Sequence, residues 1–353
     1  MLNVFLKHNY ELFAISNYYP SAPTYPGAEA IVSRGFPTWD HPVAINGKLV
    51  EGHFDWNEEI SKWENELSPV QRAKLPLKAN TDKMFPKWPK KVLEIPNAEH
   101  HNFQYENGEN VSGLHMCCPG SLFISGTFDA RNEFGTFSHL GIDFGAGLFW
   151  KEAVDHICDG LMIPDGGGIT INHPKWSKLD REFLLEMLDY DSRILGMEVL
   201  EYGANSENIW DWVLSTGRQC YGFFVPDWGA LMDIDVFGVN VLVVPERTAE
   251  ACLRAYRKGN SYGATRGYGE LKFTSISFKD NVLHASTDKP AKFQVKSANG
   301  VVAEFEGTEF DYTPTGEGFS CGPLTDIFLR IVATAADGCG EVLYSQPFML
   351  TNN

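Results

Sequence analysis

Strand-like apolar runs alternate with segments of helical periodicity between residues 169 and 259, and this alternation restricts the possible folds more than any other feature. In each helical segment the apolar residues recur at spacings of three and four, as they do on one face of an α-helix. The expected strands are 169–172, 194–203, 220–229 and 239–246, and the expected helices are 177–190, 206–218 and 248–259. Strands that alternate with helices predict βα units, and therefore a parallel sheet or barrel.

The strand at 169–172 ends in an unusual way, because His173 and Pro174 follow it directly. Proline cannot donate a ladder hydrogen bond and usually marks the end or edge of a strand. Three glycines at 166–168 allow the backbone to enter the strand by a path that other residues resist. We therefore expect His173 to lie at the end of a short buried strand, which is where α/β folds place their chemistry.

The first half of the chain is less regular. Three strands are expected at 10–17, 91–101 and 113–120, and a helix is expected at 148–161. A segment rich in proline and tryptophan, with one helix at 57–67, occupies roughly residues 20–90. An insertion of that length in a compact domain is usually a functional loop or a lid. Its tryptophans line a lid over a ligand or form a core of the insertion itself; they are Trp39, Trp56, Trp63 and Trp88.

The periodicity changes near Gly267, where apolar and polar residues begin to alternate. The expected strands are 271–278, 281–287, 291–297, 301–307, 326–335 and 341–350. Turn-forming residues at 279–281, 297–300 and 336–340 separate them. The pattern predicts two domains, an α/β domain at 1–266 that carries the long insertion and an all-β, immunoglobulin-like sandwich at 267–353.

Four polar residues occupy equivalent places in the α/β part. Glu99 follows the apolar run "VLEIP" (92–96) and His115 lies in the short strand at 113–120, whereas His173 and Asp227 end two other strands. We expect them to converge at the carboxyl edge of a parallel sheet, where two histidines and two carboxylates suit Zn²⁺, Mn²⁺ or iron. Each residue also has a purely structural interpretation. A histidine at a strand end can bond to the backbone, and Asp227 can cap the turn that follows it.

The segments "GGGITINHPKW" (166–176) and "GMEVLEYG" (196–203), followed by "NIWDWVLSTGRQCYGFFVPDWG" (208–229), resemble the PHP superfamily of polymerase and histidinol phosphatase metal-dependent phosphoesterases. The end of the chain, 326–350, is similar to the small β-sandwich that follows the barrel in some members. The resemblance implies a distorted (β/α)7 barrel of TIM-like type, with its site at the carboxyl mouth and its first strand missing from this sequence.

The resemblance also implies metal ligands, and the family motifs match unevenly. The middle of three family metals would take Glu99, His115 and His173. The first would share Glu99 and take Asp227, but the family's amino-terminal His-x-His is absent here. Positions of the third correspond to Asn17, Tyr18 and Gly229, which are poor ligands. We therefore expect one tightly bound divalent metal ion.

Two functions follow from this reading. The first is a metal-dependent hydrolase of the phosphoesterase type that acts on a small phosphorylated substrate. The second is a catalytically impaired barrel that binds a ligand or a partner. Substrate contacts are assigned to His100, Arg131 and Lys175, and to the altered positions Asn17 and Tyr18. The alternative for His100, Arg131 and Lys175 is ordinary solvated surface.

The net charge limits which classes of partner the protein can bind, and the cysteine content bears on its cellular compartment. The formal net charge of −17 argues against nucleic acid, but not against a small anion held through a metal ion. No apolar run approaches the length of a membrane span, and Lys7 and His8 interrupt the opening segment before a secretory signal can form. Seven cysteines without a framework spacing predict reduced thiols and a cytoplasmic protein.

The opening residues read as the second half of a helix. Leu2, Phe5 and Leu6 lie on one helical face, and no capping residue precedes them. A PHP barrel has a strand before this helix, and its absence would leave an unpaired sheet edge. We therefore expect the natural gene product to be longer at its amino end, with Met1 an internal methionine. An upstream extension would bear on the localisation.

Overall fold

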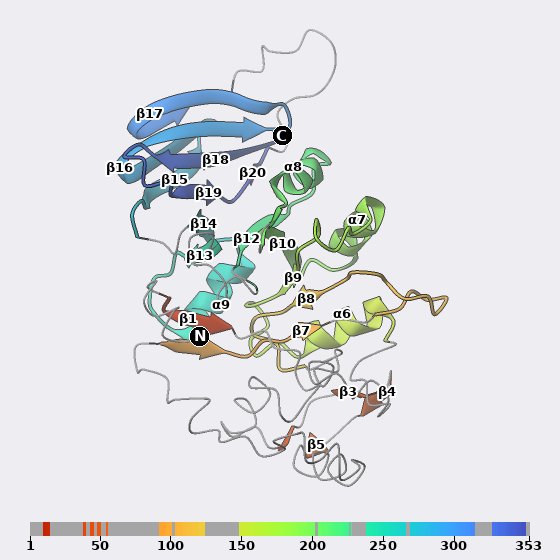
Figure 1. Cartoon of the computed structure of the whole chain (residues 1–353). Helices are drawn as coiled ribbons and strands as arrows, with labels where there is room; N and C mark the ends of the chain where they lie inside the picture. The colour runs from red at the N-terminus through yellow and green to blue at the C-terminus, as the bar shows by residue number, and fades with distance from the viewer. Residues whose placement is uncertain are drawn as a thin grey trace, which may run out of the picture. The chain divides into compact units, whose positions relative to one another are not determined.

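The computed structural model describes residues 10–14, 38–39, 43–45, 48–50, 54–55, 92–100, 103–123, 148–201, 204–225, 227, 238–265, 269–314 and 327–350. Figure 1 shows a mixed α/β chain in which strands outnumber helices among these residues. The chain divides into two compact units, one made of 11–172 with 248–254 and the other of the remaining residues. No described helix is both long and apolar enough to cross a membrane.

The first unit is built on short strands. Its strands are β1 (Leu12–Ala14), β2 (Thr38–Trp39), β3 (Val43–Ile45), β4 (Lys48–Val50), β5 (Phe54–Asp55), β6 (Leu93–Ile95), β7 (Glu99–His100), β8 (Met116–Cys117) and β9 (Ile169–Ile171). β1 and β6 pair in parallel, and both lie within strands that the sequence predicted. β2 pairs with β5 and β3 with β4, both antiparallel. The helix expected at 57–67 and the tryptophans at 56, 63 and 88 lie outside the described residues.

The strands β7, β8 and β9 differ from the expected parallel arrangement. β8 lies between the other two and pairs antiparallel with both. The chain doubles back between β7 and β8, where an antiparallel bridge joins Gln104 to Asn110 and Gly108 takes a φ of 82° at the tip. A tight return of this kind places the next strand antiparallel to the one before it. Period and spacing in the sequence did not reveal that reversal.

Helix α6 (Trp150–Asp159) forms in the place the sequence predicted, and the amide of Trp150 donates to the carbonyl of Gln104 at 2.9 Å. Its apolar face is completely buried through Trp150, Val154 and Ile157. Ser121 ties the helix end to the loop after β8, since its Oγ donates to the carbonyl of Ile157 at 2.6 Å. The same Oγ accepts from the amide of Phe123 at 3.1 Å. This packing fixes the loop that follows β8.

The second unit begins with helices and strands at the places where the sequence predicted them. Its elements up to residue 247 are α7 (Arg181–Tyr190), β10 (Ile194–Glu201), β11 (Ala204–Asn205), α8 (Glu207–Ser215), β12 (Tyr221–Phe224) and β13 (Gly238–Leu242), but β13 joins the antiparallel sheet that makes up the rest of this unit. Helix α9 (Ala249–Arg257) has residues in both units, because the division of the chain falls after residue 254. β10 and β12 pair in parallel. The strands β7 to β12 belong to one six-stranded sheet, in which β7, β8, β9, β10 and β11 follow one another and β12 pairs with β10 (Figure 1).

An eight-stranded sheet forms the rest of the second unit. It contains β13 with β14 (Ser261–Thr265), β15 (Phe273–Lys279), β16 (Val282–Ser297), β17 (Gly300–Tyr312), β18 (Phe328–Ala335), β19 (Val342–Ser345) and β20 (Phe348–Met349). Its described strands pair antiparallel, and Leu283, Phe293 and Ile331 are among the residues of its core. Two of its strands, β13 and β14, precede the predicted domain boundary at residue 267, which itself stays a prediction.

Two of the predicted strand boundaries in this sheet were wrong. Strands expected at 281–287 and 291–297 are one strand, β16, because a register shift between Ser286 and Ala291 absorbs the intervening residues. Pro290 lies in that bulge, one of the few places where a sheet accepts proline. The single strand expected at 341–350 is broken near Gln346, whose side chain exchanges two 2.8 Å hydrogen bonds with the backbone of Gly222.

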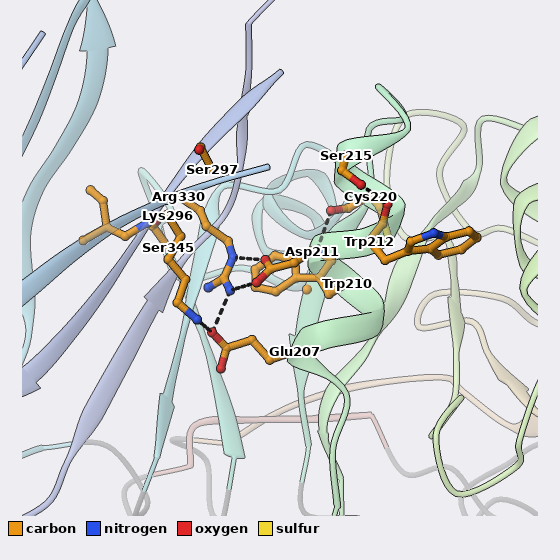
Figure 2. A network of polar contacts seen from close by, with 12 residues as sticks. Glu207, Trp210, Asp211, Trp212, Ser215, Cys220, Lys296, Ser297, Arg330 and Ser345 are labelled. Atoms are coloured by element: carbon orange, nitrogen blue, oxygen red, sulfur yellow. Dashed lines mark hydrogen bonds and ion pairs between the residues drawn. The ribbon is translucent and has the colours of Figure 1, made fainter. Parts of the chain in front are cut away.

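A buried ion-pair network joins helix α8 to the eight-stranded sheet (Figure 2). Arg330 on β18 is fully buried and donates from Nε and Nη2 to the two carboxylate oxygens of Asp211, at 2.6 and 2.8 Å. Its Nη2 also donates to Glu207 at 2.6 Å, and Lys296 on β16 pairs with the same carboxylate. The guanidinium lies 4.7 Å from the ring centre of Trp210. A planar fork bonded to two carboxylates satisfies most of a charge that burial would otherwise penalise.

Asp211→Ala should therefore destabilise the protein far more than a comparable exposed change. It leaves the buried Arg330 charge with one carboxylate fewer, which costs about 3 kcal/mol of unfolding free energy for a pair of this kind. Asp189→Ala is the matched control, because Asp189 accepts the same two-pronged bond from Arg218 at 2.7 and 2.7 Å but is exposed. Its loss should cost below about 1 kcal/mol. Urea unfolding measures both, and equal losses would contradict the assigned weight of the network.

The same network predicts a pH dependence of stability. Burial alone would raise the pKa of Glu207, but the charges and hydrogen bonds of Arg330 and Lys296 outweigh it and hold that pKa below its ordinary value of 4.5. A depressed folded-state pKa stabilises the fold above the unfolded-state pKa, and this contribution is lost as the pH falls through the folded-state value. The stability advantage of the wild type over Glu207→Gln should thus shrink below about pH 4.5.

Glu341→Gln provides the control of opposite sign for the pH experiment. Burial raises the pKa of Glu341, and hydrogen bonds from the backbone of Leu271 and Gly269 only partly offset that effect. Wild type should therefore gain stability relative to Glu341→Gln as the pH falls towards the acid range. Urea unfolding at a series of pH values gives both trends. Two trends of the same sign would show that the pH dependence does not arise from these two carboxyls.

Candidate metal centre

Glu99, His115 and His173 form the one group of potential metal ligands found among the described residues. Each offers one ligand atom, and these atoms lie within 4.8 Å of one another. Glu99 and His173 are buried, with 7% and 5% of their surface exposed, whereas His115 is half-buried. The group therefore has a closed side and one side open towards solvent.

The antiparallel strands β7, β8 and β9 determine where these residues lie. Glu99 is the first residue of β7, and it is the direct partner of Cys117 on β8. His115 immediately precedes β8, and its carbonyl accepts from the amide of Asn172 at 3.0 Å. Asn172 is joined by a peptide bond to His173, so one backbone hydrogen bond brings the ends of two segments together.

Contacts around Glu99 are those of a ligand cluster. Its Oε1 lies 3.1 Å from Nδ1 of His115 and accepts from Nδ2 of Asn172, also at 3.1 Å. Two ligand atoms on one tetrahedral zinc ion, each about 2.0–2.1 Å from it, are separated by about 3.3 Å. The spacing of the carboxylate and the imidazole therefore fits a shared cation with little rearrangement.

His173 is held in an uncommon backbone conformation. Its φ is 29°, in the left-handed region that non-glycine residues seldom adopt. Its amide donates to Oε2 of the buried Glu198 at 2.8 Å, and its ring Nδ1 lies 2.8 Å from Oγ of Ser177. Because Ser177 engages Nδ1, the other ring nitrogen, Nε2, remains as the donor to a metal ion. The ring also packs edge-on against Trp176, with centroids 5.0 Å apart.

Other residues predicted for this site do not join the group. Asp227 is exposed and also has a left-handed φ, of 40°, and its role as a ligand stays a prediction. His100 is completely buried, and its ring stacks on Phe123 with centroids 6.3 Å apart. The Nζ of Lys175 donates to the carbonyl of Asn205 at 3.1 Å in an exposed setting. The remaining predicted positions, Asn17, Tyr18, Arg131 and Gly229, lie outside the described residues.

The position of His100 has a simple cause. Successive side chains of a strand point to opposite faces, so His100 faces away from Glu99 within the two-residue strand β7. It lies in the core beside Phe123, and Phe123 stacks in turn on His156 of α6 with centroids 5.5 Å apart. The predicted contact between His100 and a substrate is not favoured by this placement.

Three residues that support the ligands were missed by the sequence analysis: Asn172, Ser177 and Glu198. Glu198 carried a usable signal, because it is the one charged residue inside the apolar stretch 194–200, and a buried carboxylate needs a partner. Ser177 follows His173 by four residues within a hydrogen-bonded turn, a separation at which side chains can meet. Asn172 carried no signal beyond its place next to a histidine.

No protein-family model, curated protein or solved structure matches the chain. A metal centre is therefore inferred from the chemistry and spacing of the side chains themselves. One carboxylate and two imidazoles within 4.8 Å of one another can hold a metal ion. The buried Glu198 and Asn172 add the outer hydrogen bonds that orient ligands in metal sites.

Glu198→Ala should weaken metal binding by about 10- to 100-fold, because His173 loses the carboxylate that holds its backbone amide. Glu341→Ala is the matched control. Glu341 is also buried and accepts from the amide of Leu271 at 2.7 Å, but it directly precedes β19 of the eight-stranded sheet. Both variants should lose stability, and only Glu198→Ala should lose affinity in a Zn²⁺ titration against a chromophoric chelator. Equal affinities would mean that Glu198 serves the fold alone.

Proposed function

We propose that this protein is a metal-dependent hydrolase of the phosphoesterase type that acts on a small phosphorylated substrate. The observation that supports it best is the gathering of Glu99, His115 and His173 into one group of ligand atoms. The resemblance of 166–229 to the PHP superfamily supplies the reaction class. The six-stranded sheet then corresponds to part of a distorted (β/α)7 barrel, an assignment that belongs to the same proposal.

The ligand chemistry favours zinc, with manganese and iron as alternatives. Two histidines and one glutamate make a common catalytic zinc set, in which three protein ligands leave a position for water or substrate. The same nitrogen and oxygen donors also suit Mn²⁺ and Fe²⁺. A single carboxylate limits the negative charge available here, so we expect one tightly held ion per chain.

The roles that we assign to the residues of the site follow from how exposed each side chain is. A divalent ion bound here would polarise a phosphoryl oxygen and lower the pKa of a bound water molecule. Glu99 and His173 are buried and form the fixed side of the site, and Ser177 holds the ring of His173 in one orientation. His115 is the half-buried member, with 20% of its side chain exposed, so a substrate would approach along its side.

A non-catalytic, ligand-binding protein is the second candidate. Asp227, which the PHP resemblance assigns to another metal ion, does not belong to the ligand group. A site for a single ion has less charge with which to stabilise the in-line transfer of a phosphoryl group than a site for two. This candidate predicts that phosphorylated metabolites raise the melting temperature without being hydrolysed.

Metal analysis together with turnover tests the proposal. The purified protein should hold at most one equivalent of transition metal and should hydrolyse a generic aryl phosphate or a small phosphodiester when Mn²⁺ or Zn²⁺ is added. His173→Ala should lose both the metal and the activity, because it removes one of three ligands. His284→Ala is the control, since His284 pairs with Asp311 on the eight-stranded sheet.

Each result separates the candidates. Three equivalents of metal per chain would contradict a single site. Bound metal without turnover across a broad panel of phosphoesters and divalent ions would overturn the hydrolase and favour the ligand-binding protein. If His173→Ala keeps its metal, His173 has a structural role and the ligand group is wrong.

A further inference from the structure

In the described part of the chain, Asn172 contacts or adjoins all three candidate ligands. Its amide donates to the carbonyl of His115 at 3.0 Å, its side-chain Nδ2 donates to Oε1 of Glu99 at 3.1 Å, and the peptide bond links it to His173. Only 3% of its surface is exposed. A side chain so buried and so placed can set the geometry of the whole group.

The same Nδ2 also donates a hydrogen bond to the thiol sulfur of Cys117, at 3.2 Å. Cys117 is the direct cross-strand partner of Glu99, so the two side chains project from the same face of the sheet. The sulfur therefore lies near the ligand cluster, yet it does not belong to the group of atoms within mutual reach of one ion. The amide nitrogen of Asn172 bridges the carboxylate and the thiol.

The orientation of the Asn172 amide follows from these contacts. Both neighbours of its nitrogen are acceptors, and the reverse orientation would turn Oδ1 towards the Glu99 carboxylate. As placed, Oδ1 is buried without a hydrogen-bond partner in the described part of the chain. A buried oxygen without a hydrogen bond costs stability. The presence of an asparagine here therefore indicates that the two hydrogen bonds donated by its Nδ2 serve a purpose that offsets this cost.

We propose that Asn172 is the positioning residue that sets the ligand chemistry of the metal centre, on which the proposed function also rests. It fixes Glu99 as an oxygen ligand and keeps the thiol of Cys117 out of the ligand set. The consequence is a nitrogen and oxygen site. A sulfur ligand would make the site softer and would disfavour ions such as Mn²⁺ that prefer oxygen.

Cobalt is the probe that tests this assignment, because Co²⁺ bound to a thiolate shows a sulfur-to-metal charge-transfer band in the near ultraviolet that nitrogen and oxygen ligands do not give. Wild type should bind Co²⁺ without that band. Asn172→Ala and Asn172→Leu both remove the side-chain amide that donates to Glu99 and Cys117. Alanine leaves space for the sulfur to move, and leucine preserves the volume. Asn172→Ala should bind Co²⁺ about 10- to 100-fold more weakly and should show the band. Adding Cys117→Ala should abolish the band.

Asn97→Ala is the matched control for loss of a buried, bridging asparagine. Asn97 is 8% exposed, donates to the carbonyl of Ala14 at 3.3 Å and accepts from the amide of Cys118 at 2.9 Å. It joins β1 to the residue that follows β8, and its hydrogen bonds in the described part of the chain do not involve a candidate ligand. The variant should lose stability on heating, but its Co²⁺ affinity and spectrum should match those of wild type. This comparison separates a role in positioning from a role in the fold.

The outcomes are distinct. If Asn172→Leu, which keeps the packing, binds Co²⁺ with the wild-type affinity and spectrum, Asn172 is a core residue and the proposal is wrong. Weaker binding by Asn172→Ala without a sulfur band overturns the part that concerns Cys117. Failure of wild type to bind Co²⁺, Zn²⁺ or Mn²⁺ at all would instead remove the metal centre and with it the proposed hydrolase.

Discussion

The burial of ionisable side chains is the constraint on which the rest of this structure depends. A charge taken out of water must be paired or hydrogen-bonded, or the fold is lost. Arg330 meets this need with the carboxylates of Asp211 and Glu207, and Glu341 meets it with backbone amides. Glu198 holds the amide of His173 in the same way. Glu99 differs, because its contacts are an imidazole and an amide that also belong to the candidate metal centre.

This difference separates structural from functional burial. Arg330 and its partners couple a helix to a sheet, and both signs of charge are present in the chain itself. Around Glu99 the ligand group gathers a carboxylate and two imidazoles, a set whose electron pairs converge and that a cation would complete. The left-handed backbone of His173 adds to this view, since strain of that kind persists where surrounding contacts enforce it and often marks a site.

The sequence allowed the local elements and the ligand trio to be predicted, but not how the strands pair. Helices α7, α8 and α9 have a clear apolar periodicity, and each forms where it was expected. The antiparallel order of β7, β8 and β9 was missed because strands of two or three residues carry no signal for direction. The supporting roles of Glu198 and Asn172 depend on residues 25 and 73 positions away, which no local pattern reveals.

The way the ligands are positioned has a further consequence for how such a site tolerates change. Strand register places Glu99, a backbone hydrogen bond places His115, and a carboxylate places His173. Two of these three determinants are main-chain contacts, which most side-chain substitutions leave intact. The candidate metal centre should therefore be most sensitive at the few buried polar side chains that touch a ligand directly. Glu198 and Asn172 are two such side chains. Substitutions at these two positions should affect metal binding, whereas substitutions of core residues away from the ligands should affect stability alone.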